Sequence, residues 1–170
     1  MGRSQFQRFQ KSDVLHAGIL LGVPSFVKAR RKQGRKGLGL RYEEKVQGHL
    51  KDEYPNYVAS PWFQYRLRDA PNRINYAQPD GLLIDVMRGL VTIIEVKYSH
   101  TVDAYYQLYD KYLPLVEHFF RVEGNRLWSF AVVEVVRWYD CATAYPCSVV
   151  LREHVHTVRP GEFAVHICRV

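Results

Sequence analysis

Short apolar runs separated by polar turns occupy the middle of the chain and predict strands. Residues 91–96 are apolar on both faces, which predicts a buried strand. Residues 82–86 predict its antiparallel partner, across a turn near residues 87–89. Glu95 and Lys97 stand at the end of the buried strand. Ionisable groups in such a place are costly unless they pair or bind an ion, so this hairpin is the candidate functional site.

Helical spacing of apolar residues predicts two longer helices. Residues 42–54 form the first, and its inner face carries Glu43, Val46, Gln47 and Leu50. Residues 101–120 form the second, in which Pro114 is expected to kink or split the helix because proline lacks a backbone N–H. Ser12 and Asp13 are expected to begin a short helix that runs to residue 19.

The remaining strand signals predict a mixed sheet. Residues 58–67 are expected to form a strand, in which Pro61 indicates either an edge position or a late start, and a loop is expected at residues 71–73. Residues 128–139 are rich in β-branched side chains and predict a central strand. Residues 147–157 and 162–169 predict a C-terminal β-hairpin. This order of elements indicates an α/β domain built on a mixed β-sheet flanked by helices.

The composition limits the class of protein. A chain of 170 residues is long enough for one domain with a sizeable core, and its 47% hydrophobic and 24% charged residues are typical of a soluble globular protein. No apolar run approaches the roughly 18 residues of a membrane span, so no membrane partner is expected. The three cysteines form no C-x-x-C pair and argue against a disulfide framework. These features favour a cytoplasmic protein with reduced thiols.

Positive charge exceeds negative charge by a formal +7, which favours an anionic partner, nucleic acid before membrane. The chain is expected to divide into a basic, partly flexible N-terminal arm over residues 1–37 and a folded domain over residues 38–170, which carries the candidate site. The basic run is either a solvated linker or a contact to phosphates, and its lack of counter-charge favours phosphate contact. The residues concerned are Lys28, Arg30, Arg31, Lys32, Arg35, Lys36 and Arg41.

The spacing of the charged residues in the hairpin suggests its chemistry. Fourteen residues separate Asp80 from Glu95, with the turn near the middle, so folding brings the two roughly opposite each other. Lys97 lies two residues after Glu95 and therefore on the same strand face. Asp85 lies near the turn and is the poorer partner. Two carboxylates and a backbone carbonyl suit Mg²⁺, and a neighbouring lysine can orient a water molecule or a phosphate.

Pro79-Asp80, fourteen residues, and Glu95-Val96-Lys97 resemble the motif of the PD-(D/E)xK nuclease superfamily. Glu43 resembles the acid of that superfamily's first helix. The order of the expected elements resembles the superfamily's restriction-endonuclease-like core, and the resemblance covers about residues 38–140.

The resemblance implies a role for each matching residue. Asp80 and Glu95 would be metal ligands assisted by the Val96 carbonyl, with Lys97 as the catalytic lysine and Glu43 as an auxiliary acid. It also implies Mg²⁺ as cofactor, with Mn²⁺ as a substitute, and DNA as the partner.

These inferences predict a Mg²⁺-dependent deoxyribonuclease. The small chain favours an endonuclease, and a homodimer would allow both strands to be cut. Two alternatives stay open: an exonuclease of the same superfamily, and a non-catalytic nucleic-acid-binding protein on the same fold. For the hairpin itself, the alternative is an ordinary surface turn with a Glu95–Lys97 salt bridge, against which the buried apolar run argues.

Two further patterns carry less information. Gln107 matches a helix glutamine of exonuclease-like members of the superfamily, but Lys111 stands where those members carry tyrosine. His154, His156, His166 and Cys168 form same-face pairs on the terminal hairpin, for which ordinary sheet residues are favoured over a zinc site.

Overall fold

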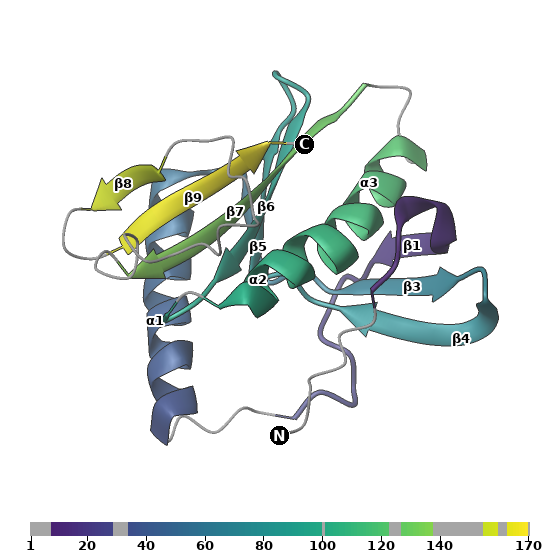
Figure 1. Ribbon diagram of the computed structural model, residues 1–170, viewed down its shortest axis with the longest axis horizontal. Coiled ribbons are helices and arrows are strands. Elements are labelled where there is room, and N and C mark those ends of the chain that lie inside the picture. Colours follow the sequence, from purple (N-terminus) through teal and green to yellow (C-terminus); the bar gives the residue numbers. More distant parts are fainter. Residues whose placement is uncertain are drawn as a thin grey trace.

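The computed structural model describes residues 8–28, 34–99, 101–122, 127–137, 155–159 and 163–169. Figure 1 shows its layers: a long helix on one face of a six-stranded sheet, a helical segment on the other face, and a three-stranded sheet beyond that segment. The architecture is therefore α/β, with one mixed and one antiparallel sheet.

The larger sheet contains, in spatial order, β2 (Tyr57–Ala59), β5 (Gly81–Asp85), β6 (Leu90–Val96), β7 (Ser129–Arg137), β9 (Phe163–Arg169) and β8 (Val155–Arg159). β6 and β7 are parallel, and the other neighbours are antiparallel. Both lie inside the sheet, where helices cover the two faces, and this explains why their sequences are apolar at almost every position. The expected hairpin and central strand are confirmed. The terminal hairpin is confirmed for the paired strands β8 and β9, whereas residues 147–154 of its expected first arm lie outside the described residues.

The helix α1 (Gly34–Glu53) covers one face of this sheet. Its side chains Val46 and Leu50 are buried against Ile94 of β6 and Val133 of β7. The inner face expected from the helical spacing is therefore confirmed. The helix begins earlier than expected, within the segment assigned to the basic arm.

The connection between β6 and β7 covers the opposite face. It consists of α2 (Val102–Gln107), the π-helical η2 (Leu108–Tyr112) and α3 (Leu113–Val122). Leu113 donates its backbone N–H to the carbonyl of Leu108, five residues earlier, which is the hydrogen bond of a π-turn. Pro114 follows directly and has no N–H to donate. The expected interruption of the helix at Pro114 is thus confirmed, and it takes the form of one wide turn.

The smaller sheet packs on the far side of α3 (Figure 1). Its strands are β1 (Val14–Ile19), β3 (Phe63–Leu67) and β4 (Ala70–Ala77), paired in the order β1-β3-β4. Phe63, Leu115 and Ile93 belong to one buried cluster that joins this sheet, α3 and the larger sheet. Residues 113–116 of α3 are all buried, which a helix with a single covered face would not allow.

Three expectations from the sequence are wrong. Residues 12–19 do not form a helix: after the short 3₁₀ turn η1 (Lys11–Asp13), the chain pairs with β3 as strand β1. Residues 71–73 lie in β4, where Pro71 fits because β4 is an edge strand. Residues 58–67 do not form one strand, because Ser60, with a φ of 45°, turns the chain from β2 in one sheet to β3 in the other.

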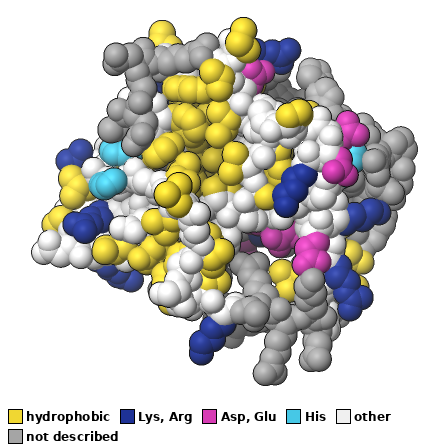
Figure 2. All heavy atoms as spheres, turned by 180° about the vertical axis from the view of Figure 1, so that it is seen from behind, with side chains coloured by type: hydrophobic (Ala, Val, Ile, Leu, Met, Phe, Trp, Pro, Cys, Tyr) yellow, Lys and Arg dark blue, Asp and Glu magenta, His cyan; other side chains and the backbone are white. Residues whose placement is uncertain are grey.

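The face opposite to that of Figure 1 is divided by side-chain type. Hydrophobic side chains form a central band, and acidic side chains gather mainly to its right (Figure 2).

None of the described helices combines the length and the apolar character that crossing a bilayer requires.

Leu115 offers a test of the layered packing, because its side chain is 0% exposed. Leu115→Ala is expected to lower the free energy of unfolding by about 2–5 kcal/mol, the usual cost of such a cavity. Leu127→Ala is the matched control, because Leu127 is 97% exposed, and it should change the stability by less than about 0.5 kcal/mol. Urea unfolding followed by circular dichroism measures both. Equal effects of the two substitutions would contradict the packing.

Candidate functional site

The hairpin of β5 and β6 brings Asp80 to the end of β6, as the sequence predicts. Gly81 pairs with Ile94, so the preceding residue, Asp80, lies beside Glu95. The Asp80 carboxylate accepts a hydrogen bond from the backbone N–H of Val96, with a distance of 2.7 Å between Oδ2 and N. Asp85 lies at the other end of β5, where its Oδ1 accepts the backbone N–H of Arg88 at 2.9 Å in the turn. Its assignment as a turn residue is therefore confirmed.

Hydrogen bonds also fix the main chain of Asp80. Its carbonyl oxygen accepts the backbone N–H of Ser60 at 2.9 Å, the hydroxyl of Tyr57 at 3.1 Å and the Nε2 group of Gln47 at 3.2 Å. These donors come from the β2–β3 connection, β2 and α1. Three separate segments thus determine where the Asp80 carboxylate can point. None of the three was assigned a role from the sequence, which gives no sign of which carbonyl they meet.

Gly81 is required by the same arrangement. A Cβ atom added there would lie 2.3 Å from Cε2 of the Tyr57 ring, closer than real Cβ contacts come. The ring lies against the strand because its hydroxyl reaches the Asp80 carbonyl. The glycine after Pro79-Asp80 therefore leaves room for the residue that holds Asp80 in place.

Glu95 and Lys97 form a buried ion pair at the end of β6. Glu95 is 3% exposed, and its Oε1 accepts a hydrogen bond from Lys97 Nζ at 2.5 Å. Its second oxygen, Oε2, is buried and has no hydrogen-bond partner among the described residues. Burial raises the pKa of Glu95 to about 8, and the neighbouring Asp80 carboxylate adds to the rise. A carboxylate oxygen left in this state is a group that a cation would satisfy.

The pKa of Lys97 responds to the negative charge around it. Burial disfavours the charged ammonium, but the carboxylates of Glu95, Asp80 and Glu134 outweigh that effect and raise the pKa. The ammonium is therefore kept as a cation.

Glu134 is a site residue that the sequence analysis missed. It pairs with Glu95 in the parallel register of β6 and β7, and it is 1% exposed. A single acid inside the apolar run of residues 130–136 was the available signal, because such a run predicts a buried strand. Only the register shows that this acid neighbours Glu95 and Lys97.

Lys111 is a second residue whose position the sequence did not reveal. Val91 and Ile93 of β6 pack against η2 and α3. Because alternate residues of a strand share a face, Glu95 points to the same side of the sheet, where η2 lies. Lys111 lies on η2, where burial lowers the pKa of its ammonium and the charge of Glu95 partly offsets the effect. It forms no ion pair within the described part of the chain. The π-turn therefore presents a second lysine near the buried carboxylate.

Glu43 approaches the hairpin from α1. Its Oε1 accepts a hydrogen bond from Gln47 Nε2 at 3.4 Å, and the same amide donates to Ser60 Oγ at 2.8 Å. Its charge contributes to the raised pKa of Glu95. The helix acid expected from the sequence thus faces the Asp80 region and is joined to it through Gln47.

The basic residues of the expected arm are described only in part. Lys28 is exposed and lines a cavity together with Glu43, and Arg41 is exposed on α1. Arg35 and Lys36 lie in α1, but their side chains fall outside the described part. The other three arm residues also lie outside it: Arg30, Arg31 and Lys32. Whether they contact phosphate therefore stays a prediction.

The two weaker sequence patterns fare differently. The side-chain oxygen of Gln107 is buried and accepts no hydrogen bond from the described residues. The zinc alternative concerns side chains that all lie outside the described part: His154, His156, His166 and Cys168.

The residues at the end of β6 fit a hard divalent cation. No three His, Cys, Asp or Glu side chains of the described residues are grouped so as to hold a metal ion by themselves. A cation here would therefore draw on the carboxylates of Asp80 and Glu95, the Val96 carbonyl and water molecules, as Mg²⁺ commonly does. The unsatisfied Glu95 Oε2 supports this fit.

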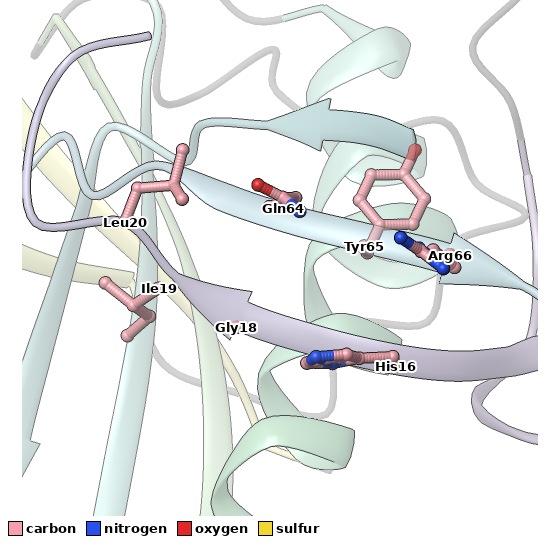
Figure 3. A pocket seen from close by; sticks show the side chains of 7 residues that line it. All are labelled: His16, Gly18, Ile19, Leu20, Gln64, Tyr65 and Arg66. Atoms are coloured by element: carbon pink, nitrogen blue, oxygen red, sulfur yellow. The ribbon is translucent and has the colours of Figure 1, made fainter. Parts of the chain in front are cut away.

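Of the two cavities described here, only the larger adjoins the site. The smaller, of about 210 Å³, lies over β1 and β3, where His16, Gln64 and Arg66 line it (Figure 3). Neither Asp80 nor Glu95 contributes to it. The larger, of about 480 Å³, is lined by Glu43, Gln47, Ser60 and Gln78 among others, and therefore adjoins the residues that bind the Asp80 carbonyl.

Comparison of the chain with protein-family models, curated proteins and solved structures gave no match.

Gly81→Ala tests the contact between Gly81 and Tyr57. The added methyl group is expected to lower the free energy of unfolding by about 1–3 kcal/mol, because it overlaps the Tyr57 ring. Gly48→Ala is the control: it lies in α1 with nothing within 4 Å of the added atom, and it should raise stability by about 0.5–1 kcal/mol. Urea denaturation measures both changes. A neutral Gly81→Ala would show that the ring does not hold this position.

Proposed function

We propose that the protein is a metal-dependent nuclease of the PD-(D/E)xK type, on a restriction-endonuclease-like core, that hydrolyses phosphodiester bonds of DNA. One observation carries the proposal. Asp80, Glu95 and Lys97 converge at the end of β6, where Glu95 keeps a buried oxygen without a hydrogen-bond partner among the described residues. An ordinary salt bridge at a surface turn would not bury its acid to 3% exposure.

The arrangement of elements supports the same proposal. α1 precedes the β5–β6 hairpin, and a helical connection leads from β6 to the parallel strand β7. This is the order that the resemblance leads one to expect. The formal charge of +7 suits a polyanionic substrate.

The residues of the site would divide the work as follows. Asp80, Glu95 and the Val96 carbonyl would bind Mg²⁺, for which Mn²⁺ can substitute. The bound cation supplies positive charge to a phosphoryl oxygen and lowers the pKa of its water. Lys97 Nζ, held at Glu95 Oε1, presents a compact positive charge that orients the attacking water or steadies the phosphate. The bonds to the Asp80 carbonyl keep the first carboxylate oriented, so little reorganisation is needed.

Three further residues would shape the electrostatics. Glu43 would act as an auxiliary acid, and the Gln47 amide, which donates to both Glu43 and the Asp80 carbonyl, joins it to Asp80. Glu134 helps to keep Lys97 positively charged. Lys111 supplies a second cation near Glu95 that can offset negative charge on the substrate.

We further propose that the enzyme is an endonuclease. A covalently closed DNA circle has no ends, so it is cut by an endonuclease and left intact by an exonuclease. A nucleic-acid-binding protein without activity would bind both circular and linear DNA and cut neither. Incubating the chain with circular and with linear single-stranded DNA in Mg²⁺ or Mn²⁺, alongside the corresponding duplexes, therefore separates the three functions.

Asp80→Asn and Lys97→Ala are expected to reduce the rate of DNA cleavage at least about 100-fold, because the first removes a proposed metal ligand and the second removes the cation that acts on the attacking water or the phosphate. Asp85→Asn is the matched control, since Asp85 lies on the same strand and its carboxylate serves the turn. Single-turnover cleavage of a labelled DNA measures the three variants. Cleavage that persists unchanged in both Asp80→Asn and Lys97→Ala would refute the proposed site.

Metal binding is expected to stabilise the folded protein independently of cleavage. A cation at Asp80 and Glu95 compensates for the burial and for the Asp80 charge that together raise the pKa of Glu95, so saturating Mg²⁺ or Mn²⁺ should add about 2–3 kcal/mol to stability. Chelation by EDTA should remove that increment.

Thermal unfolding without DNA measures this effect, with Asp85→Asn responding like the unmodified chain and Asp80→Asn responding little. An unmodified chain whose Tm is the same with and without either ion would argue against the metal site.

A further inference from the structure

The 480 Å³ cavity next to Asp80 has the character of a ligand site. Its walls come from the segment at residues 23–28, from α1 and from the connection between β2 and β3. Val23, Val27 and Leu40 make part of the lining apolar, whereas amide and hydroxyl side chains make another part polar. Apolar walls with a few placed polar groups, at this volume, are typical of pockets for small organic groups.

The polar wall of the cavity is the same set of side chains that positions Asp80. Gln47 donates to both the Asp80 carbonyl and Ser60 Oγ. Gln78 Nε2 donates to the Ser60 carbonyl at 3.0 Å. Ser60 itself is held at a φ of 45°, a conformation that is costly for a residue with a side chain. A group in the cavity would therefore contact the side chains that hold the main chain of Asp80 in place.

Trp62 is the aromatic residue that lines the cavity. Phe26 packs edge to face on its ring, with the ring centroids 6.2 Å apart. The indole N–H of Trp62 is buried and has no acceptor among the described residues.

These features together select the chemistry of the occupant. A flat heterocycle can stack on the Trp62 ring and can form hydrogen bonds with the amide and hydroxyl side chains of the polar wall. Exposed Lys28 at the same cavity supplies a cation for an attached phosphate, in a place where Glu43 and Glu44 would otherwise repel it.

We propose that this cavity holds one unpaired nucleobase of the DNA strand, next to the phosphate that is cut. The inference rests on the proposed nuclease function and narrows its substrate class. A base inside a duplex must lose its pairing and stacking to enter such a cavity, which costs a few kcal/mol, so the preferred substrate is DNA with unpaired nucleotides at the cleavage position: a single strand, a flap or a junction.

The test measures binding in EDTA, where the metal-dependent cutting is off. A single abasic analogue is moved, position by position, along a labelled single-stranded oligonucleotide, and the Kd of the full-length chain is measured for each. The cavity predicts one position at which the lost base weakens binding about 5-fold to 100-fold, while its neighbours change Kd much less. A scan in which every position is equivalent would overturn the proposal.

Variants link that position to the cavity. In Trp62→Ala the abasic penalty at this position should disappear, because the base no longer has its wall. Trp62→Phe retains a ring, loses the N–H and should fold normally, with a smaller but measurable loss of affinity for the intact strand. Trp128→Phe is the control, since Trp128 packs against Phe120 away from this cavity. A penalty unchanged in both Trp62 variants would overturn the assignment.

Two comparisons separate the remaining sources of binding. Free dTMP should displace the oligonucleotide only weakly, and displacement as strong as that by the oligonucleotide itself would mean a free-nucleotide site and overturn the proposal. A perfectly paired duplex should bind more weakly than the single strand, and equal binding would also overturn it.

The outcome is separable from that of the nuclease proposal. If no position in the abasic scan is sensitive and Asp80→Asn is inactive, the base site is refuted and the nuclease proposal stands. If one position is sensitive and Asp80→Asn is fully active, the proposed catalytic site is refuted and the cavity remains a nucleic-acid-binding site.

Discussion

The burial of the Glu95 carboxylate at the end of β6 is the constraint on which the site depends. An acid that is 3% exposed is stable only if other groups compensate for the water that it has lost. Lys97 compensates one oxygen, and no described hydrogen-bond donor compensates the other. The raised pKa of Glu95 expresses the same imbalance, since Asp80 lies beside it and adds negative charge. Evaluated purely as a contribution to stability, this arrangement is poor, and that is the physical argument for a function.

The two-sheet architecture makes such burial feasible. α3 is enclosed between the sheets, which lets Leu115 and Val116 both be buried and fixes this helix by packing on both sides. The π-turn just before Pro114 adjoins this packed helix and carries Lys111 to the face of β6 that Glu95 shares. The register of β7 brings Glu134 beside the same acid. The smaller sheet therefore contributes to the site indirectly, by holding the helix that faces it.

The connection between β2 and β3 joins the site to the adjoining cavity. Ser60 changes the direction of the chain between the two sheets, and its N–H, hydroxyl and carbonyl all form hydrogen bonds to residues around Asp80. An occupant of the cavity would contact these same groups. Substrate binding and the orientation of Asp80 would then be coupled through very short paths, without any large movement of the fold.

Elements with strong local signals could be predicted from the amino-acid sequence alone. Alternation and apolar runs located the β5–β6 hairpin, spacing paired Asp80 with Glu95, and helical periodicity gave the inner face of α1. These features depend on residues close together in the chain or on a single turn.

The contacts that distant segments make with the site residues follow from the folded chain and could not be predicted from local patterns. Glu134 joins the site through a parallel register, and Ser60 and Tyr57 meet the Asp80 carbonyl after the chain has crossed between sheets. β1 is a strand because β3 offers it hydrogen bonds, although its residues alone favoured a helix. Local patterns encode which face a residue takes, whereas long-range pairing determines which groups share that face, and pairing is fixed by the packing of the whole domain.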